Sequence, residues 1–269
     1  MKTILITGAS SGIGLATAQR FQAEGWNVAA TMRNPAHPTP LQGLANLALL
    51  RMDVTERASI DAAVAATIEQ FGGLDVLLNN AGYGLAGSLE ALTPEQLERQ
   101  FATNVYGTIY TTQACLPHFR ERRAGVIINV TSIGGRLVFP YFTAYHATKF
   151  ALEGLSESLA FELAPLGIRV KLVEPGGVKT DFAGRSLELA RHDAYADSMK
   201  RVFAAFADPE RAQNYSEPAA IADVIFQAAT DGTDQLRYLA GADAVAMAAA
   251  RAQTTDEAYR EFMLQRFNL

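Results

Sequence analysis

The types and spacing of Ser132, Tyr145 and Lys149 indicate chemistry at a carbonyl or alcohol group. Tyr145 and Lys149 are four residues apart, so on a helix they lie one turn apart on the same face. A free phenol has a pKa of about 10, and a neighbouring ammonium favours the phenolate and lowers that pKa. Such a phenol can give a proton to a nascent alkoxide or take one from an alcohol. Positioned acid–base catalysis of this kind typically contributes ~10²–10⁴ in rate.

Ser132 and Asn104 complete the candidate catalytic set. Ser132, at the end of a predicted strand, can hydrogen-bond the substrate oxygen and hold it in place. Asn104 lies within a predicted helix, where it is either a satisfied core residue or part of a proton relay to Lys149. Simpler interpretations exist, because Tyr-x-x-x-Lys occurs by chance on helices and Ser132 can be a turn residue. The combination, in this order, favours an active site.

The N-terminal segment predicts a phosphate-binding loop, because glycines separate its first strand from its first helix. Backbone N–H groups and the helix dipole can then face a pyrophosphate. Gly8 permits a tight turn, Gly12 allows close approach of the phosphates, and Gly14 lets the helix pack against the strand. The expected cofactor contacts in this loop are Gly8, Ser10, Ser11, Gly12, Ile13 and Gly14.

The end of the second predicted strand indicates which dinucleotide binds. An acidic residue there would bind a ribose 2′-hydroxyl, whereas a basic one accommodates a 2′-phosphate. Arg33 stands at this position with no acid beside it, and a guanidinium can bind a phosphate through two hydrogen bonds. We therefore predict NADP(H) over NAD(H), unless Arg33 is merely a solvent-facing loop residue. Asp53 either accepts a hydrogen bond from the adenine amino group or is an acid at a helix N-terminus.

Short apolar runs alternate with helical periods along the chain, which predicts an α/β fold with a mainly parallel sheet and helices on both faces. The predicted strands span 4–6, 28–31, 47–52, 74–78, 126–130, 170–173 and 236–239. The predicted helices span 12–24, 61–71, 143–163, 219–229 and 256–267, with another beginning near Pro94.

The segment 181–216 interrupts this alternation. Its composition is helical, and it follows the carboxyl end of a strand, where ligands bind in open α/β sheets. It is predicted to be a substrate-covering lid, or alternatively an ordinary packed helix pair. The length of 269 residues fits one domain, 1–269, that includes this insertion.

Charge and composition exclude several classes of partner. The net charge of −5 argues against binding to nucleic acid or anionic membranes. The apolar runs are shorter than the roughly 18 residues of a membrane span, and the N-terminus predicts no secretory signal. Cys115 is the single cysteine, which rules out intramolecular disulfides and multi-cysteine metal sites. A cytoplasmic protein without a metal is expected.

The chain resembles the short-chain dehydrogenase/reductase family over essentially its whole length. The matching residues are Thr7-Gly8-x-x-x-Gly12-x-Gly14, Asn79-Asn80-Ala81-Gly82, Asn104, Ser132, Tyr145-x-x-x-Lys149 and Pro175-Gly176. The resemblance implies a Rossmann-type, doubly wound, seven-stranded sheet and a catalytic tetrad of Asn104, Ser132, Tyr145 and Lys149. It also implies that Lys149 bonds the nicotinamide ribose and that Asn104 holds a relay water.

The resemblance implies further cofactor contacts and an oligomer. The groove would be lined by Asn80, Ala81, Gly82, Pro175 and Gly176, the adenine framed by Asp53 and Val54, and the carboxamide met by Val178 and Thr180. Family members are usually homodimers or homotetramers that associate through two long helices, which correspond here to 101–116 and 145–163.

Two residues depart from the family pattern. Ser11 stands where many NADP-preferring relatives carry a basic residue, so Arg33 alone carries that prediction. Glu174 stands where asparagine is common. A looser likeness over 131–182 points to members that act on steroids, retinoids and other bulky apolar alcohols or ketones. The pocket mouth would then be formed by Tyr83, Leu137, Val138, Phe139, Tyr141, Phe142 and Phe182.

Two other functions compete with an oxidoreductase. An NADP(H)-binding sensor without turnover would have no need of the Tyr145–Lys149 pair. A serine hydrolase would need a Gly-x-Ser-x-Gly turn and a histidine base. Ser132 lies in Thr-Ser-Ile-Gly-Gly, and His146 is expected to point away from it.

Overall fold

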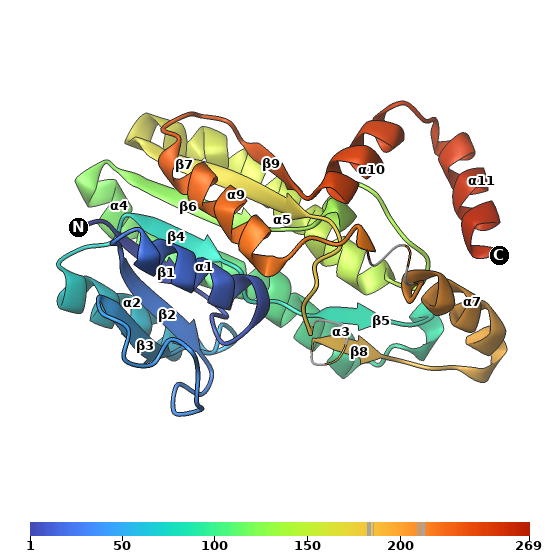
Figure 1. The fold of residues 1–269 in the computed structure, drawn as a ribbon, viewed down its shortest axis with the longest axis horizontal. Helices are drawn as coiled ribbons and strands as arrows, with labels where there is room; N and C mark the ends of the chain where they lie inside the picture. The colour runs from blue at the N-terminus through green and yellow to red at the C-terminus, as the bar shows by residue number, and fades with distance from the viewer. Residues whose placement is uncertain (182–183, 185, 209, 211–212) are drawn as a thin grey trace.

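A seven-stranded parallel sheet organises the computed structural model, which describes residues 1–269 except 182–183, 185, 209 and 211–212. The strand order is β3-β2-β1-β4-β6-β7-β9 (Figure 1). The strands of this sheet are β1 (Thr3–Ile6), β2 (Asn27–Met32), β3 (Leu47–Arg51), β4 (Val76–Asn79), β6 (Gly125–Val130), β7 (Ile168–Pro175) and β9 (Arg237–Ala240). The expected doubly wound, Rossmann-type fold is confirmed.

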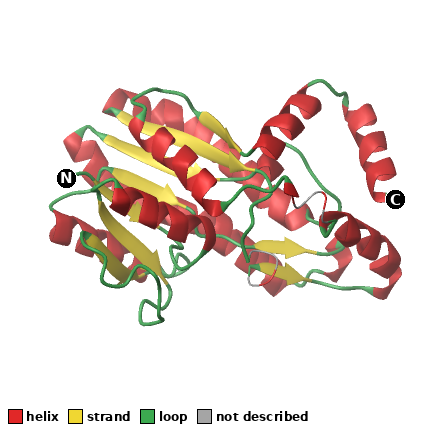
Figure 2. Cartoon of the chain, in the orientation of Figure 1, coloured by secondary structure: helices red, strands yellow, loops and turns green. Residues whose placement is uncertain are grey.

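Helices flank both faces of the sheet (Figure 2). The α-helices that the structure describes are α1 (Gly12–Ala23), α2 (Arg57–Phe71), α3 (Pro94–Phe101), α4 (Gly107–Arg122), α5 (Thr143–Leu163), α7 (Ala196–Phe206), α9 (Pro218–Thr230), α10 (Ala242–Ala252) and α11 (Asp256–Phe267). Of these, α7 and α11 lie away from the sheet (Figure 1).

Alternating side chains of the strands supply a separate core to each face. On β1, Ile4 and Ile6 pack in the cluster that includes α1 and α9, whereas Leu5 packs in the one that includes α2 and α4. Phe21 of α1 and Phe119 of α4 are completely buried in these two cores. Burying a side chain of this kind typically contributes ~1.5–3 kcal/mol. These two layers fix the strand ends that carry the site.

The winding of the sheet reverses between β1 and β4. From β1 the chain proceeds outward through β2 and β3, and then returns to β4 on the other side before continuing through β6 and β7. In open α/β sheets, ligands bind at such a reversal, beyond the carboxyl ends of the strands. The glycine-rich loop follows β1 and Asn80 follows β4, so both lie at this edge.

Several elements differ from the sequence-based expectation. Residues 187–189, expected to be helical, form strand β8, which pairs with β5 (Gly84–Ala86) in a second, two-stranded sheet. Helix α10 was not predicted. Helix α2 begins at Arg57 rather than at 61. Strand β4 begins at Val76 rather than at 74, where the backbone N–H and carbonyl of Leu74 bond the side chains of His118 and Arg122.

The helix around Asn104 also departs from a regular α-helix. Helices α3 and α4 are joined by the π-helical segment Ala102–Tyr106, and the residues at both junctions have right-handed helical backbone angles. Asn104 therefore lies in a π-helical turn rather than in the middle of an α-helix. Such turns are frequent at functional sites.

No described helix is long and apolar enough to cross a membrane.

Candidate active site

Tyr145 and Lys149 project from the first turns of α5, beside the end of β6. A hydrogen bond joins the side chains of Tyr145 and Ser132. The Lys149 ammonium lies 5.7 Å from the centre of the Tyr145 ring and donates a 3.1 Å hydrogen bond to the carbonyl oxygen of Val130. Lys149 is 8 % exposed. The structure thus brings together three of the four expected catalytic residues.

The pKa of Tyr145 shifts in the opposite direction to the one expected. Burial raises the pKa of the phenol, and the hydrogen bond with Ser132 opposes that rise. The expected lowering of this pKa below its ordinary value is therefore not found, because loss of hydration outweighs the hydrogen bond with Ser132. Burial also lowers the pKa of Lys149 to about 8, against the opposing effect of the Glu153 charge.

The fourth residue, Asn104, uses its side chain to fix the chain around it. Its Oδ1 accepts from the Tyr83 N–H at 3.0 Å, and its Nδ2 donates to the Tyr83 carbonyl at 2.9 Å and to Thr148 Oγ1 at 3.2 Å. Thr148 in turn donates to the carbonyl of Tyr145 at 2.7 Å. The interpretation as a satisfied core residue therefore describes this side chain. Thr148 was not singled out from the sequence, although it lies within the Tyr-x-x-x-Lys motif.

The glycine-rich loop turns sharply and packs closely against the chain after β4. Gly8 has φ +70°, and a Cβ there would lie 3.0 Å from Cα of Ala81. A Cβ on Gly14 would overlap the Gly8 carbonyl oxygen and approach Asn80 Nδ2 to 2.6 Å. Gly14 therefore permits close packing of helix α1, against the loop at Gly8 rather than against the strand itself.

Asn80 and Thr7 hold this turn in place. Asn80 Nδ2 donates to the carbonyl oxygens of Thr7 and Gly8 at 3.0 and 3.1 Å. Thr7 Oγ1 accepts from the backbone N–H groups of Asn80 and Ala81 at 2.9 and 3.0 Å. Thr7 was quoted from the sequence only as part of the motif, and the structure gives it a structural role. Gly82 follows, where a Cβ would lie 3.2 Å from Asn104 Oδ1.

The start of α1 fits a dinucleotide phosphate. The first N–H groups of a helix have no intrahelical partner, and Ser11 at the N-cap makes no side-chain capping hydrogen bond. The first turn carries no acidic residue. Gly12 has φ +55°, and a Cβ there would lie 3.3 Å from the Thr180 side chain. Free backbone N–H groups at a helix start, next to a glycine that leaves room for a ligand, can bind an anion. Ser10 and Ile13 lie in the same turn.

Pro175, Gly176 and Val178 reach the same edge from β7. The Gly176 N–H donates to the Ala240 carbonyl at 3.1 Å, and Val178 forms a parallel bridge with Ser216. Asp243 of α10 accepts from the Gly177 N–H at 2.7 Å, and a Cβ on Gly176 would overlap its carboxylate. Asp243 carried no recognisable signal in the sequence because the helix that presents it was not predicted.

Arg33, Asp53 and Val54 lie at the ends of β2 and β3. Arg33 is exposed, and among the described residues no side chain pairs with it. Asp53 Oδ1 accepts from the N–H and hydroxyl of Thr55 at 2.9 and 2.7 Å, so one carboxylate oxygen serves the local turn. Val54 is buried against Gly107, whose added Cβ would approach it to 2.8 Å.

Glu174, the second departure from the family pattern, belongs to a cluster of charges near Lys149 in which the carboxylates are buried and Arg136 is exposed. Its carboxylate lies 3.3 Å from both Arg136 and Arg237, and Arg237 also bonds Glu153 at 3.1 Å. Burial and the charge of Glu153 raise the pKa of Glu174 to about 7. The Oε1 atoms of Glu153 and Glu174 have no hydrogen-bond partner among the described residues. A proton on Glu174 removes one of two buried negative charges, which costs less than keeping both.

The expected pocket-mouth residues do not gather in one place. Phe142 packs edge-on against Tyr145, with ring centres 6.4 Å apart, and against Phe203 and Phe206 of α7 at 5.9 and 5.5 Å. The hydroxyl of Tyr141 bonds Ser198 of α7. The hydroxyl of Tyr83 instead meets Arg99 at 3.4 Å, and Phe182 lies outside the described residues.

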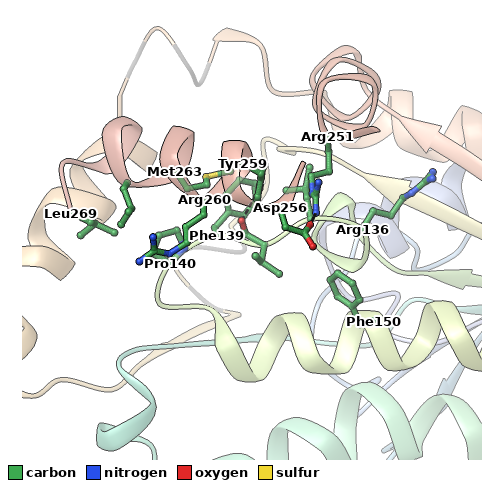
Figure 3. Close-up of a pocket in the computed structure, with 13 residues that line it drawn as sticks. Arg136, Phe139, Pro140, Phe150, Arg251, Asp256, Tyr259, Arg260, Met263 and Leu269 are labelled. Atoms are coloured by element: carbon green, nitrogen blue, oxygen red, sulfur yellow. Dashed lines mark hydrogen bonds and ion pairs between the residues drawn. The ribbon is translucent and has the colours of Figure 1, made fainter. Parts of the chain in front are cut away.

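Leu137, Val138 and Phe139 line a cavity of about 490 Å³ between their loop and the C-terminal helices (Figure 3). Tyr259 and Met263 of α11 close the opposite side, and Phe150 of α5 contributes the floor. The catalytic candidates do not line this cavity among the described residues, so it is separate from the Tyr145 site.

The comparisons with known proteins agree with this geometry. A family described as short chain dehydrogenase matches residues 2–189. The 3-ketodihydrosphingosine reductase of Bacteroides thetaiotaomicron is 43 % identical over 74 % of this chain and 73 % of its own. A short-chain dehydrogenase structure from Streptomyces avermitilis has a TM-score of 0.81 and 35 % identity, covering 99 % of this chain and 96 % of that one.

Two solved structures that the chain resembles hold different nicotinamide cofactors. ElxO with NADP bound has a TM-score of 0.73 and 28 % identity, over 88 % of this chain and 97 % of that chain. The 3-ketoacyl-(acyl-carrier-protein) reductase of Brucella melitensis, in complex with NADH, has a TM-score of 0.71 and 28 % identity, over 88 % and 96 %. The likenesses therefore indicate a nicotinamide cofactor without selecting between the two forms.

Proposed function

Because this chain belongs to the short-chain dehydrogenase family of oxidoreductases, we propose that it interconverts a carbonyl and a secondary alcohol on a largely apolar small molecule, using NADP(H). The proposal rests on the hydrogen-bonded pair of Ser132 and Tyr145, with the Lys149 ammonium 5.7 Å from the centre of the Tyr145 ring. The pair lies at the sheet edge where the glycine-rich loop ends β1. A proton donor and an oxygen-binding hydroxyl thus adjoin a surface suited to a dinucleotide.

The chain's own residues manage the proton and the substrate oxygen. When bound, the nicotinamide ring supplies or accepts the hydride. Tyr145 gives a proton to the developing alkoxide, and its raised pKa favours the protonated phenol that reduction requires. Ser132 donates a hydrogen bond to the same oxygen and orients the carbonyl. Lys149 stabilises the phenolate that remains, and Asn104 holds the surrounding backbone.

We propose that the cofactor lies along the carboxyl edge of the sheet. Its phosphates would meet the loop from Gly8 to Gly14, and Asn80, Ala81 and Gly82 would border the groove. Val178 and Thr180 would face the carboxamide, and the second carboxylate oxygen of Asp53 would accept the adenine amino group. A Cβ on Gly12 would lie 3.3 Å from the Thr180 side chain, so the phosphate loop and the proposed carboxamide residue lie close together.

Arg33 is proposed to select NADP(H), because its exposed guanidinium, which pairs with no other side chain that the structure describes, can bind the 2′-phosphate. Replacing Arg33 with alanine is expected to weaken NADPH binding roughly 10- to 100-fold, since a hydrogen bond to a charged group contributes ~1.5–3 kcal/mol, and to leave NADH binding unchanged. Fluorescence titration measures both constants. Arg169→Ala, an exposed arginine paired with Asp234, is the control. Equal wild-type affinities for NADPH and NADH would refute the assignment.

An apolar substrate is supported by the aromatic side chains around Tyr145. Phe142 packs edge-on against Tyr145, and Phe203 and Phe206 of α7 pack against Phe142. The segment 181–216 would then act as the lid of a single domain. The relative from Bacteroides thetaiotaomicron is named as a reductase of 3-ketodihydrosphingosine, a ketone.

NADPH oxidation against a panel of carbonyls tests the proposed function. The panel runs from small aldehydes and ketones through quinones to ketosteroids and retinal, with 3-ketodihydrosphingosine included and NADH in parallel. Turnover of the bulky apolar carbonyls with NADPH is expected. Preference for small polar carbonyls would overturn the substrate proposal, and tight NADPH binding with no turnover would favour a sensor.

We also propose a cytoplasmic homodimer or homotetramer that associates through α4 and α5. Aromatic side chains are exposed on these helices, with Tyr110 at 36 %, Phe150 at 45 % and Phe161 at 76 %. Cys115 is buried and free, and burial raises the pKa of its thiol to about 12. Sedimentation velocity is expected to show a dimer or tetramer that Phe161→Glu weakens, and a monomeric wild type would contradict this.

A further inference from the structure

His146, the neighbour of Tyr145 on α5, has both ring nitrogens occupied by the loop that carries Ser132. The Phe139 N–H donates to Nε2 at 2.8 Å, and Nδ1 lies 2.7 Å from the Gly134 carbonyl oxygen. A backbone N–H can only donate, so Nε2 carries no proton and Nδ1–H donates to Gly134. His146 is 5 % exposed, and burial lowers its pKa, which keeps this neutral form.

The same loop segment holds the Ser132 hydroxyl. The Gly134 N–H donates to Ser132 Oγ at 3.0 Å, while the Gly134 carbonyl accepts from His146. A Cβ on Gly134 would lie 3.0 Å from the imidazole and 3.3 Å from Ser132 Oγ. The ring, the peptide groups of residue 134 and the serine hydroxyl therefore form one contiguous set of contacts.

We propose that His146 is a positioning residue that holds Ser132 in line with Tyr145 by fixing its loop at Gly134 and Phe139. This inference rests on the proposed function, because it assigns His146 an effect on turnover that passes through Ser132. Tyr145 and His146 are adjacent on α5. This helix therefore positions the proton donor, Tyr145, directly and the Ser132 hydroxyl through the imidazole of His146. Because both ring nitrogens bond backbone groups of this loop, His146 would act through the loop and not by contact with the substrate.

A double-mutant cycle tests this role. His146→Leu is expected to lower kcat roughly 10- to 100-fold, since a small misplacement of a catalytic group can cost up to about 10²-fold, and to leave the NADPH dissociation constant within about twofold. In the Ser132→Ala background the same change is expected to have no further effect on kcat, because the group it positions is absent. Equal effects in both backgrounds, or a lower melting temperature with normal kcat, would overturn the proposal.

Two further variants separate positioning from stability. His146→Asn keeps a donor near Nδ1 and is expected to recover part of the lost rate, which also covers the case in which the leucine variant folds poorly. His118 is a matched control, because its Nε2 accepts from the Leu74 N–H at 3.0 Å at the opposite end of the sheet. His118→Leu is expected to reduce stability while leaving kcat intact.

Amide hydrogen exchange provides a readout that does not depend on turnover. In the cofactor-free protein, His146→Leu is expected to lose protection over 133–139, and His118→Leu to keep it. Unchanged protection would overturn the proposed positioning role of His146, even if the enzyme's substrate had not been found. Absence of wild-type turnover on every carbonyl would instead reject the proposed function. The exchange result alone would then decide whether His146 fixes the loop.

Discussion

Replacing Tyr145 with phenylalanine is expected to lower kcat by about 10²–10⁴-fold, the range that positioned acid–base catalysis contributes. The ring and its packing against Phe142 would remain, so the loss reports the hydroxyl and its bond with Ser132. NADPH affinity is expected to change less than a few-fold, because the glycine-rich loop is untouched.

The control for this substitution is Tyr110→Phe, which removes a hydroxyl from a partly exposed tyrosine on α4. Steady-state kinetics with the best carbonyl of the panel and NADPH titration measure the two quantities. Near-normal turnover of Tyr145→Phe would remove the phenol from the proposed chemistry. A loss of NADPH binding equal to the loss of rate would assign Tyr145 to cofactor binding instead.

Replacing Lys149 with methionine is expected to impair both cofactor affinity and rate. Methionine keeps most of the buried stem, so the change isolates the ammonium that lies near the phenol. Loss of a charged hydrogen bond to the cofactor ribose is expected to weaken NADPH roughly 10- to 100-fold. Loss of electrostatic stabilisation at the phenolate is expected to lower kcat about 10²–10³-fold.

The pH dependence of NADPH binding gives a second readout for Lys149. Burial lowers its pKa to about 8, so the free enzyme carries the ammonium below that pH and loses it above. An ordinary lysine would keep its charge to about 10.4. Wild-type affinity is therefore expected to fall between pH 7 and 9, and the affinity of Lys149→Met to stay nearly flat. Lys2→Ala, at the opposite end of the sheet, is the control, and parallel pH profiles of wild type and Lys149→Met would contradict the assignment.

The parts of the fold that the sequence predicts are those set by local patterns. Apolar runs such as 4–6 and 126–130 locate strands because a parallel sheet buries both faces of each strand. The loop at Gly8 and Gly14 is predicted because its glycines meet a backbone requirement that other residues cannot fulfil, as positive φ at Gly8 and the overlap at Gly14 show.

The features that the sequence does not predict depend on contacts between distant segments. Strand β8 forms because Leu187–Leu189 pairs with Gly84–Ala86, about a hundred residues earlier. The pKa of Tyr145 rises because other elements bury the phenol, whereas the spacing to Lys149 reveals only the charge. The role of His146 depends on where Gly134 and Phe139 lie, which no spacing on α5 records.

The π-helical segment Ala102–Tyr106 sets the angular phase between α3 and α4. A π-helical hydrogen bond spans one residue more than an α-helical one, which corresponds to about 100° of rotation. Removing one residue there would restore a regular helix, but it would rotate Gln100 relative to Phe119 in the core. Gln100 donates a 2.9 Å hydrogen bond to the Tyr83 carbonyl, and this bond would be lost. This stretch is therefore expected to accept changes of residue type more readily than changes of length, and an insertion or deletion near Asn104 would disturb the site without altering any of its residues.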